Sequence, residues 1–172
     1  MNGRLLVAGV GNIFKSDDGF ATAVVTWLEV NALGSWPDWV VLRDYGIGGI
    51  HLAYDLLDDY DELVLVDAMH RDGASGTVYV VSPDLVAPAP EDTPAVDAHD
   101  LAPESVLALV PALGGALPRV TVVGCEPETV DDGMGLSAVV AHQVAVAGQA
   151  VCDLVAAADI RRAEAFSSAP SS

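Results

Sequence analysis

Short apolar runs alternate along this chain with longer stretches in which apolar residues recur at helical spacing. Runs of four to six residues, bounded by glycine, proline or acidic residues, are typical of buried strands. Such runs occupy residues 5–10, 39–42, 62–66, 77–81 and 119–123. Between the first two, the spacing of Ala21, Val24, Val25 and Leu28 predicts a helix over residues 17–30. Further helices are expected over residues 50–57, 104–110 and 136–163.

The predicted order of elements, β-α-β-α-β-β-α-β-α, is that of an α/β fold. It indicates a three-layer sandwich in which helices cover both faces of a mostly parallel, five-stranded sheet. No insert of helix length separates the strands expected at 62–66 and 77–81, so we expect that pair to be antiparallel. In open sheets of this class, ligands bind beyond the carboxyl ends of the strands. That edge is therefore the expected place for chemistry.

The length of 172 residues indicates a single domain, which we place at residues 1–164. Residues 165–172 consist mainly of alanine, serine and proline and are expected to form a disordered tail. Residues 83–103 carry five prolines with acidic residues between them. They are expected to form a long loop, and long loops in compact domains are usually functional or disordered.

The chain carries 7 Lys and Arg residues against 25 Asp and Glu residues, a net charge of −18. Because phosphate binding depends on Lys and Arg, this balance argues against nucleic acid and against an anionic membrane surface as partners. The apolar stretch at 105–118 is too short to cross a bilayer, and polar residues interrupt the one at 136–158. Together with the lack of a signal-peptide pattern, these features favour a soluble cytoplasmic protein.

Polar residues follow three of the predicted strands at the edge where the carboxyl ends meet. Asp17 and Asp18 follow the first strand, Asp67 directly follows the third, and His99 lies in the proline-rich loop after the fourth. Two carboxylates and an imidazole at one edge form either a divalent-metal site or an acid–base site. A carboxylate that ends a buried strand, as Asp67 does, is costly unless it is paired, hydrogen-bonded or bound to a metal.

Each of these signals has a plainer interpretation when it is taken alone. Asp17 suits the positive end of the following helix dipole equally well, and His99 by itself is an ordinary loop histidine. The pair Gly9 and Gly11 lacks the third glycine of a dinucleotide-binding motif, since Phe14 stands at its position. A nucleotide-binding domain is therefore the weakest of the functions considered, and no organic cofactor is expected.

Five segments at predicted strand ends resemble the hydrogenase maturation endopeptidases, a family that trims the C-terminus of the [NiFe]-hydrogenase large subunit after nickel insertion. These segments are VAGVGNI at 7–13 with DDG at 17–19, DYGIGG at 44–49, LVDA at 65–68, AHD at 98–100 and VGCEPE at 123–128. They stand in the family's order, and the resemblance covers roughly residues 5–158. It implies a twisted, mixed sheet of five strands between helix layers, in agreement with the apolar pattern.

The resemblance implies an endopeptidase that removes a C-terminal peptide from the nickel-loaded large subunit. The family's three metal-contacting positions fall on Asp18, Asp67 and His99, which would also be the catalytic residues. Asp18 fits the first position better than Asp17, because the family has an acid directly after another Asp there. The nickel is expected to arrive with the substrate. The peptidase would be either metal-assisted or of the aspartic type, with the Asp18–Asp67 pair activating water.

A second interpretation uses the same cleft without catalysis. The chain would then be a metal-sensing chaperone or binding module for the maturing large subunit. Its docking surface would include apolar residues near Trp36 and Trp39, although packing at the core or edge is the simpler account of these tryptophans. Binding without cleavage would distinguish this interpretation from the endopeptidase.

Overall fold

A computed structural model gives the arrangement of residues 3–58, 60–83 and 103–167. The strands are β1 (Leu5–Gly9), β2 (Val40–Asp44), β3 (Glu62–Ala68), β4 (Val78–Val81) and β5 (Arg119–Cys125). The α-helices are α1 (Phe20–Asn31), α2 (Gly49–Asp55), α3 (Pro103–Ala112), α4 (Ala138–Ala141) and α5 (Val144–Ser167), and the 3-10 turns are η1 (Ser16–Gly19) and η2 (Leu33–Ser35). Every predicted strand is present, and every predicted helix has a counterpart in the same region.

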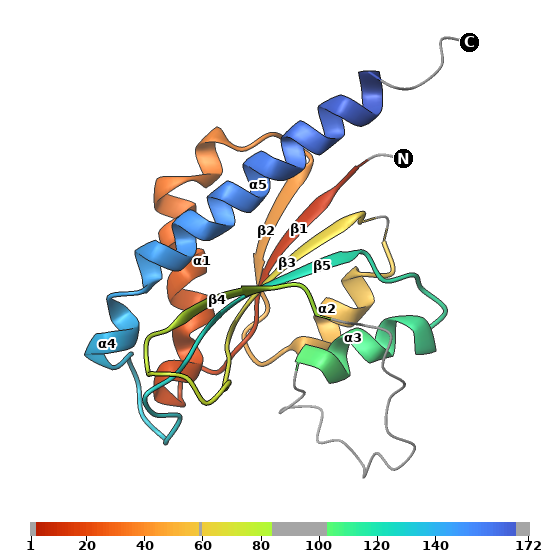
Figure 1. The fold of residues 1–172 in the computed structure, drawn as a ribbon. Helices are drawn as coiled ribbons and strands as arrows, with labels where there is room; N and C mark the ends of the chain where they lie inside the picture. Colours follow the sequence, from red (N-terminus) through yellow and green to blue (C-terminus); the bar gives the residue numbers. More distant parts are fainter. Residues whose placement is uncertain (1–2, 59, 84–102, 168–172) are drawn as a thin grey trace.

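The strands form one five-stranded sheet in the order β2-β1-β3-β5-β4 (Figure 1). β1 runs parallel to both β2 and β3, and β3 runs parallel to β5. The carboxyl ends of these four strands therefore lie at the same edge of the sheet. β4 runs antiparallel to β5. The α/β class and the mixed, mostly parallel sheet are confirmed.

The third and fourth strands do not pair with each other, so the prediction that they form an antiparallel pair is wrong. β4 does run opposite to β3, but β5 lies between them and forms a ladder with each. From Val120 on, β5 is buried almost throughout, whereas β4 is partly exposed and Val80 is 51% exposed. A strand that is apolar on both faces belongs inside a sheet, and a half-exposed strand belongs at its edge.

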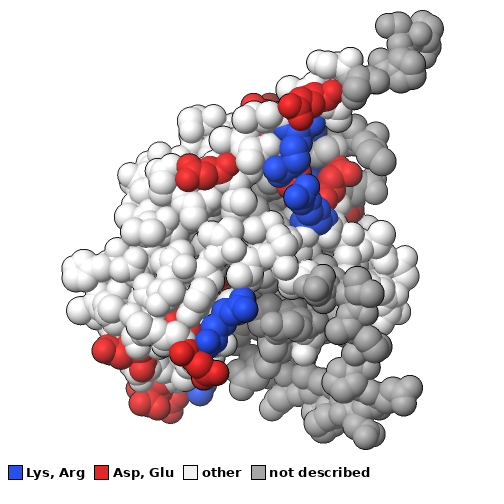
Figure 2. Space-filling model, in the orientation of Figure 1, with Lys and Arg blue, Asp and Glu red and all other residues white. Residues whose placement is uncertain are grey.

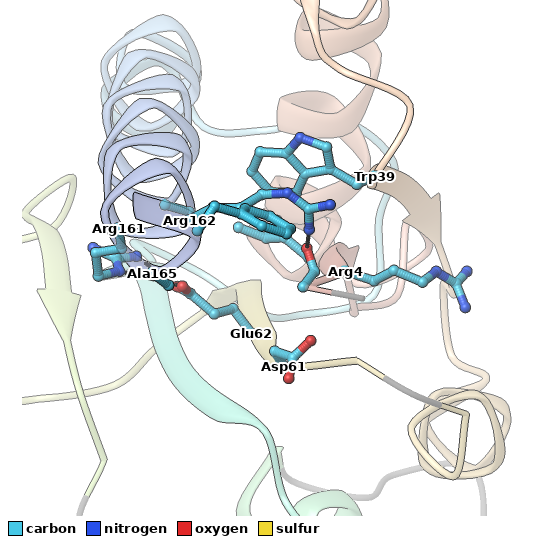
Figure 3. Close-up of a pocket in the computed structure, with 11 residues that line it drawn as sticks. Arg4, Trp39, Asp61, Glu62, Arg161, Arg162 and Ala165 are labelled. Carbon is cyan, nitrogen blue, oxygen red and sulfur yellow. Dashed lines mark hydrogen bonds and ion pairs between the residues drawn. The ribbon is translucent and has the colours of Figure 1, made fainter. Parts of the chain in front are cut away.

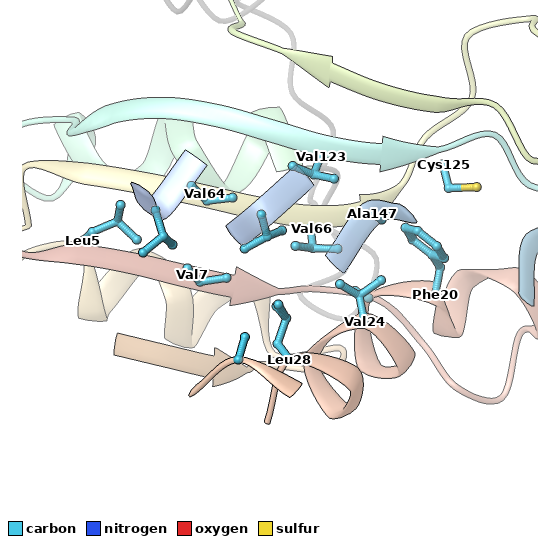
Figure 4. Close-up of a cluster of buried hydrophobic side chains, with 14 of the residues drawn as sticks. Leu5, Val7, Phe20, Val24, Leu28, Val64, Val66, Val123, Cys125 and Ala147 are labelled. Carbon is cyan, nitrogen blue, oxygen red and sulfur yellow. The ribbon is translucent and has the colours of Figure 1, made fainter. Parts of the chain in front are cut away.

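Alternation along β1 divides the core into two layers. Leu5 and Val7 face α1 and α5, whereas Leu6 and Ala8 face α2 and α3 (Figure 1). Figure 4 shows the first of these clusters, in which Phe20 of α1 packs with the side chains of the strands. Helices thus cover both faces of the sheet, which confirms the three-layer sandwich.

Two predicted helices differ from the observed ones at their ends. The helix predicted over 17–30 begins as the turn η1, and neither η1 nor α1 has a side-chain cap hydrogen bond. Ser16, Asp17 and Asp18, which precede α1, therefore do not cap it through their side chains. The helix predicted over 136–163 is divided at His142 and Gln143 into α4 and α5. Because α5 extends to Ser167, the domain boundary predicted at 164 lies inside a helix, and residues 168–172 lie outside the described residues.

The stretch Ala138–Ser167 is long and apolar enough to cross a membrane by length and composition. In this fold, α5 packs against α1 and the sheet, and a row of its residues is buried in the core. That row consists of Ala147, Val151, Val155 and Ala158. Through this row, α5 forms part of one helix layer of the sandwich, and the rest of the helix is less buried.

Gly148 allows α5 to approach α1 closely. It is buried, and a Cβ added at this position would collide with the indole ring of Trp27. We expect Gly148→Ala to lower the free energy of unfolding by about 2 kcal/mol, because the steric cost exceeds the gain in helix propensity. Urea denaturation would measure this loss. Gly34→Ala is the control, because a Cβ there meets no atom within 4 Å; equal losses at both positions would contradict the close approach.

Candidate active site at the carboxyl edge of the sheet

The segments that follow the parallel strands meet at the carboxyl edge of the sheet. The amide of Val10 donates a hydrogen bond to the carbonyl oxygen of Val66 in β3 (3.0 Å). The amide of Gly11 donates to the carbonyl oxygen of Gly46, which follows β2 (2.9 Å). The loops after the first two strands and the end of the third are therefore neighbours, at the edge where ligands of such sheets bind.

Asp67 lies at this edge, on the strand β3 at the centre of the sheet. It is the next-to-last residue of β3, which is flanked by β1 and β5. Asp67 is only 7% exposed, and Gly124 of β5 is its partner in the ladder. The ladder with β5 thus holds the backbone of Asp67, just beyond the last pair of β3 with β1, and a group positioned by a central strand suits a functional site.

Asp18 reaches the same edge from the turn η1. Its carboxylate accepts a hydrogen bond from the amide of Asn12 (2.8 Å), and η1 contacts β3, the strand that carries Asp67. Gly11 permits this arrangement, because a Cβ at that position would collide with the backbone oxygen of Asp18. The glycine motif after β1 therefore allows η1 to fold back onto the end of the strand. The structure brings Asp18 and Asp67 to one edge, as the strand-end pattern predicts.

Asp17 holds a different part of the chain. Its side chain is fully buried (0% exposed), and its carboxylate accepts hydrogen bonds from the amides of Glu128 (2.9 Å), Thr129 (3.1 Å) and Ser137 (2.7 Å). It also accepts one from the Ser137 hydroxyl (2.9 Å). Burial alone would raise the pKa of Asp17, but these four hydrogen bonds hold it below its usual value. Asp17 is therefore a structural carboxylate, which leaves Asp18 as the candidate for chemistry.

His99, the third predicted site residue, lies outside the described residues. Within the part of the chain that the structure describes, no three His, Cys, Asp or Glu side chains are grouped so that they could hold a metal ion. His51 and His142 are exposed. Of the three predicted site residues, the described part of the chain thus contains Asp18 and Asp67.

Glu126 is a third buried carboxylate at this edge, after Asp67 and Asp17, and the strand-end pattern did not single it out. It follows β5, is 4% exposed, and accepts hydrogen bonds from the amides of Arg71 (2.8 Å) and Gly73 (3.3 Å) and from the Tyr79 hydroxyl (2.9 Å). Its other oxygen lies 3.6 Å from Nδ1 of His70. Burial would raise the pKa of Glu126, but its donors and His70 lower it below the usual value. Glu126 therefore ties the loop after β3 to β4 and β5.

Cys125, the last residue of β5, is not a nucleophile in this arrangement. Burial, together with the charges of Asp17 and Glu126, raises the pKa of its thiol to about 11. The thiol therefore stays protonated near neutral pH, and a thiol is a far weaker nucleophile than a thiolate. The chemistry available at this edge is that of carboxylates, which bind divalent cations and transfer protons.

A cavity of about 450 Å³ opens at the opposite, amino edge of the sheet (Figure 3). Its lining includes Arg4, Trp39 and Glu62, together with Arg161 and Arg162 near the end of α5. Glu62 accepts two hydrogen bonds from Arg161 (3.2 and 2.6 Å), and the guanidinium of Arg162 lies 5.0 Å from the ring centre of Trp39. These contacts hold the end of α5 against the sheet. We therefore assign the residues that line this cavity a role in packing.

Comparison with known proteins identifies a family for this chain. The sequence model of the hydrogenase maturation protease family matches residues 24–154. The hydrogenase 2 maturation protease of Escherichia coli strain K12 is 31% identical over 135 residues, which cover 78% of this chain and 79% of that protein. The hydrogenase expression/formation protein HoxM of Azotobacter vinelandii is 34% identical over 130 residues, which cover 75% of this chain and 60% of HoxM.

Solved structures share the fold. The hydrogenase maturating endopeptidase HybD from Escherichia coli matches with a TM-score of 0.69 and 27% identity, over 86% of this chain and 89% of that chain. The hydrogenase 2 maturation peptidase from a Thaumarchaeota archaeon matches with a TM-score of 0.59 and 30% identity, over 88% of this chain and 95% of that chain. The five-stranded α/β arrangement described above is therefore that of known maturation peptidases.

Proposed function

The chain belongs to the hydrogenase maturation protease family, and on that premise we propose that it is an endopeptidase that removes a C-terminal peptide from the nickel-loaded large subunit of a [NiFe] hydrogenase. The observation that carries this proposal is the position of Asp18 and Asp67 at one edge of the sheet. They stand at two of the positions that the sequence resemblance associates with the metal. We place the reaction in the cytoplasm, in keeping with the acidic composition of the chain.

In this proposal, Asp18 and Asp67 contact the nickel ion of the substrate, with His99 as the third contact that the resemblance implies. Carboxylate oxygens and an imidazole nitrogen form a suitable ligand set for Ni²⁺. The metal belongs to the large subunit, and the peptidase needs no organic cofactor. Because only a loaded subunit would complete the set of contacts, trimming would report that nickel insertion has occurred.

The proposed reaction is hydrolysis of one peptide bond. The oxygen of a water molecule adds to the scissile carbonyl carbon, the C–N bond breaks, and a proton passes to the departing amine. Two routes fit the same residues. Either the nickel ion polarises the carbonyl while the carboxylates hold the metal, or Asp18 and Asp67 act as a carboxylate pair that takes and returns the proton.

A trimming assay tests the proposal directly. A nickel-loaded large subunit that still carries its C-terminal extension is incubated with this protein, and intact-mass spectrometry follows both products. We expect a shortened subunit and one released peptide, and no change in a nickel-free precursor. An unshortened subunit would overturn the proposal, and stable binding without cleavage would favour the chaperone alternative.

A site that receives its metal from the substrate is expected to bind nickel weakly by itself. Two carboxylates and one imidazole leave the other coordination positions of the ion to the large subunit. We therefore expect equilibrium dialysis of the isolated protein against Ni²⁺ to show occupancy that a chelator wash removes. Tight, stoichiometric nickel that survives the wash would contradict delivery by the substrate.

A further inference from the structure

Four large apolar side chains are exposed on two loops at the carboxyl edge. Ile13 (40% exposed) and Phe14 (62%) follow β1, and Val130 (38%) and Met134 (74%) follow β5. We call residues 11–16 and 126–137 the two-loop platform. Single exposed apolar residues are ordinary, but a group of them on adjoining loops marks an interaction surface.

Backbone hydrogen bonds hold the two loops of the platform against each other. The Gly133 amide donates to the carbonyl oxygen of Phe14 (2.9 Å), and the Ser16 amide donates to the carbonyl oxygen of Gly133 (2.8 Å). The Ser16 hydroxyl donates to the carbonyl oxygen of Asp131 (2.9 Å). Phe14 and Met134 are therefore presented from neighbouring, fixed stretches of backbone. A surface that is ordered before binding loses less conformational entropy when a partner docks.

The platform adjoins the proposed site. The amide of Asn12, within the first loop, donates to the carboxylate of Asp18. The carboxylate of Asp17, the neighbour of Asp18, accepts amide hydrogen bonds from the second loop. A protein that brings a metal ion to Asp18 therefore comes close to these loops.

The charge of the platform specifies what fits it. Glu128, Asp131 and Asp132 are exposed on the second loop, and the one basic residue of the platform, Lys15, lies 3.5 Å from Asp132. Figure 2 shows acidic side chains gathered at the lower left of the molecule, around this loop. The complementary surface is apolar with basic residues around it. A second copy of this chain is a poor occupant, because two molecules of charge −18 would meet through acidic loops.

We propose that the two-loop platform is the docking surface for the large subunit, which places apolar side chains flanked by Lys or Arg on Phe14 and Met134. This inference rests on the proposed function, and it adds the surface and chemistry by which the substrate is recognised. Docking here orients the C-terminal extension of the substrate toward Asp18 and Asp67. The platform supplies binding and orientation, and it takes no part in bond breaking.

The test compares matched exposed residues. Phe14→Ser and Met134→Ser remove the apolar contacts, and Phe166→Ser is the control, because Phe166 is equally exposed (65%) but lies at the far end of α5. Trimming rates are measured over a range of concentrations of nickel-loaded precursor. We expect KM to rise at least about tenfold for the platform variants with kcat nearly unchanged, and no change for Phe166→Ser.

Charge-reversal variants test the platform independently, in case an apolar substitution disturbs the structure of the loops. Glu128→Lys with Asp132→Lys is expected to raise KM by a similar factor, and higher ionic strength should weaken binding of the wild type. If the wild type trims and the platform variants keep its KM, the docking inference is overturned and the proposed function stands. An equal rise in KM for Phe166→Ser would also overturn the docking inference. So would a dimer of the wild-type protein that dissociates when Phe14 is replaced by serine. A wild type that does not trim removes the proposed function itself.

Discussion

Replacing Asp67 with asparagine is expected to abolish trimming of the large subunit while leaving the fold intact. The amide has nearly the shape of the carboxylate, but it carries no charge and takes up no proton near neutral pH. It therefore serves poorly as a ligand for Ni²⁺ and cannot act as a base, whichever of the two routes operates. Losing a general base alone costs on the order of 10²–10⁴ in rate. Initial rates from intact-mass spectrometry at saturating precursor would measure the loss.

The control for this variant is Asp159→Asn, which makes the same chemical change at an exposed position of α5. It should trim at the wild-type rate, and circular dichroism melts should show that both variants fold. Asp18→Asn is expected to behave like Asp67→Asn. A trimming rate within twofold of the wild type for Asp67→Asn would remove this residue from the site.

The position of Asp67 could be predicted because its signal is local. A buried apolar run fixes a strand, an acid directly after the run must lie at its end, and the parallel topology brings such ends to one edge. The same signal applies to Glu126, which directly follows β5 and is likewise buried. The pattern does not reveal that Glu126 is occupied by structural hydrogen bonds, because its donors belong to another loop and to β4.

The separate roles of Asp17 and Asp18 could not be predicted from neighbouring residues. Asp17 is oriented by Glu128, Thr129 and Ser137, which are 111 to 120 positions away along the chain. The place of β4 at the sheet edge likewise depends on β5, which comes later in the chain and forms a ladder with both β3 and β4. In both cases a long-range contact decides between two arrangements that local patterns favour equally.

Asp17→Asn is expected to destabilise the fold severely, in contrast to Asp18→Asn. An asparagine at position 17 keeps one acceptor oxygen, but its NH₂ group, itself a donor, faces donors that bond to the carboxylate in the wild type. Leaving buried donors unsatisfied costs about 1–3 kcal/mol each, so we expect a loss of about 4 kcal/mol in the free energy of unfolding. Urea denaturation would measure it, with Asp18→Asn as the matched control, expected within about 1 kcal/mol of the wild type.

The pH dependence of the free energy of unfolding shows how much of the stabilisation by Asp17 depends on the charge of its carboxylate and how much on its shape. Since the pKa of Asp17 is lower in the folded protein than its usual value of 3.8, the unfolded chain binds the proton more readily. The stabilisation is therefore complete above about pH 5 and is lost as the pH falls through the folded-state pKa. Urea denaturation at a series of pH values should show wild-type stability falling steeply below about pH 4, and Asp17→Asn falling less, with Glu126 contributing to the slope that remains. Parallel curves for the two proteins would show that the Asp17 carboxylate carries no such charge-dependent stabilisation.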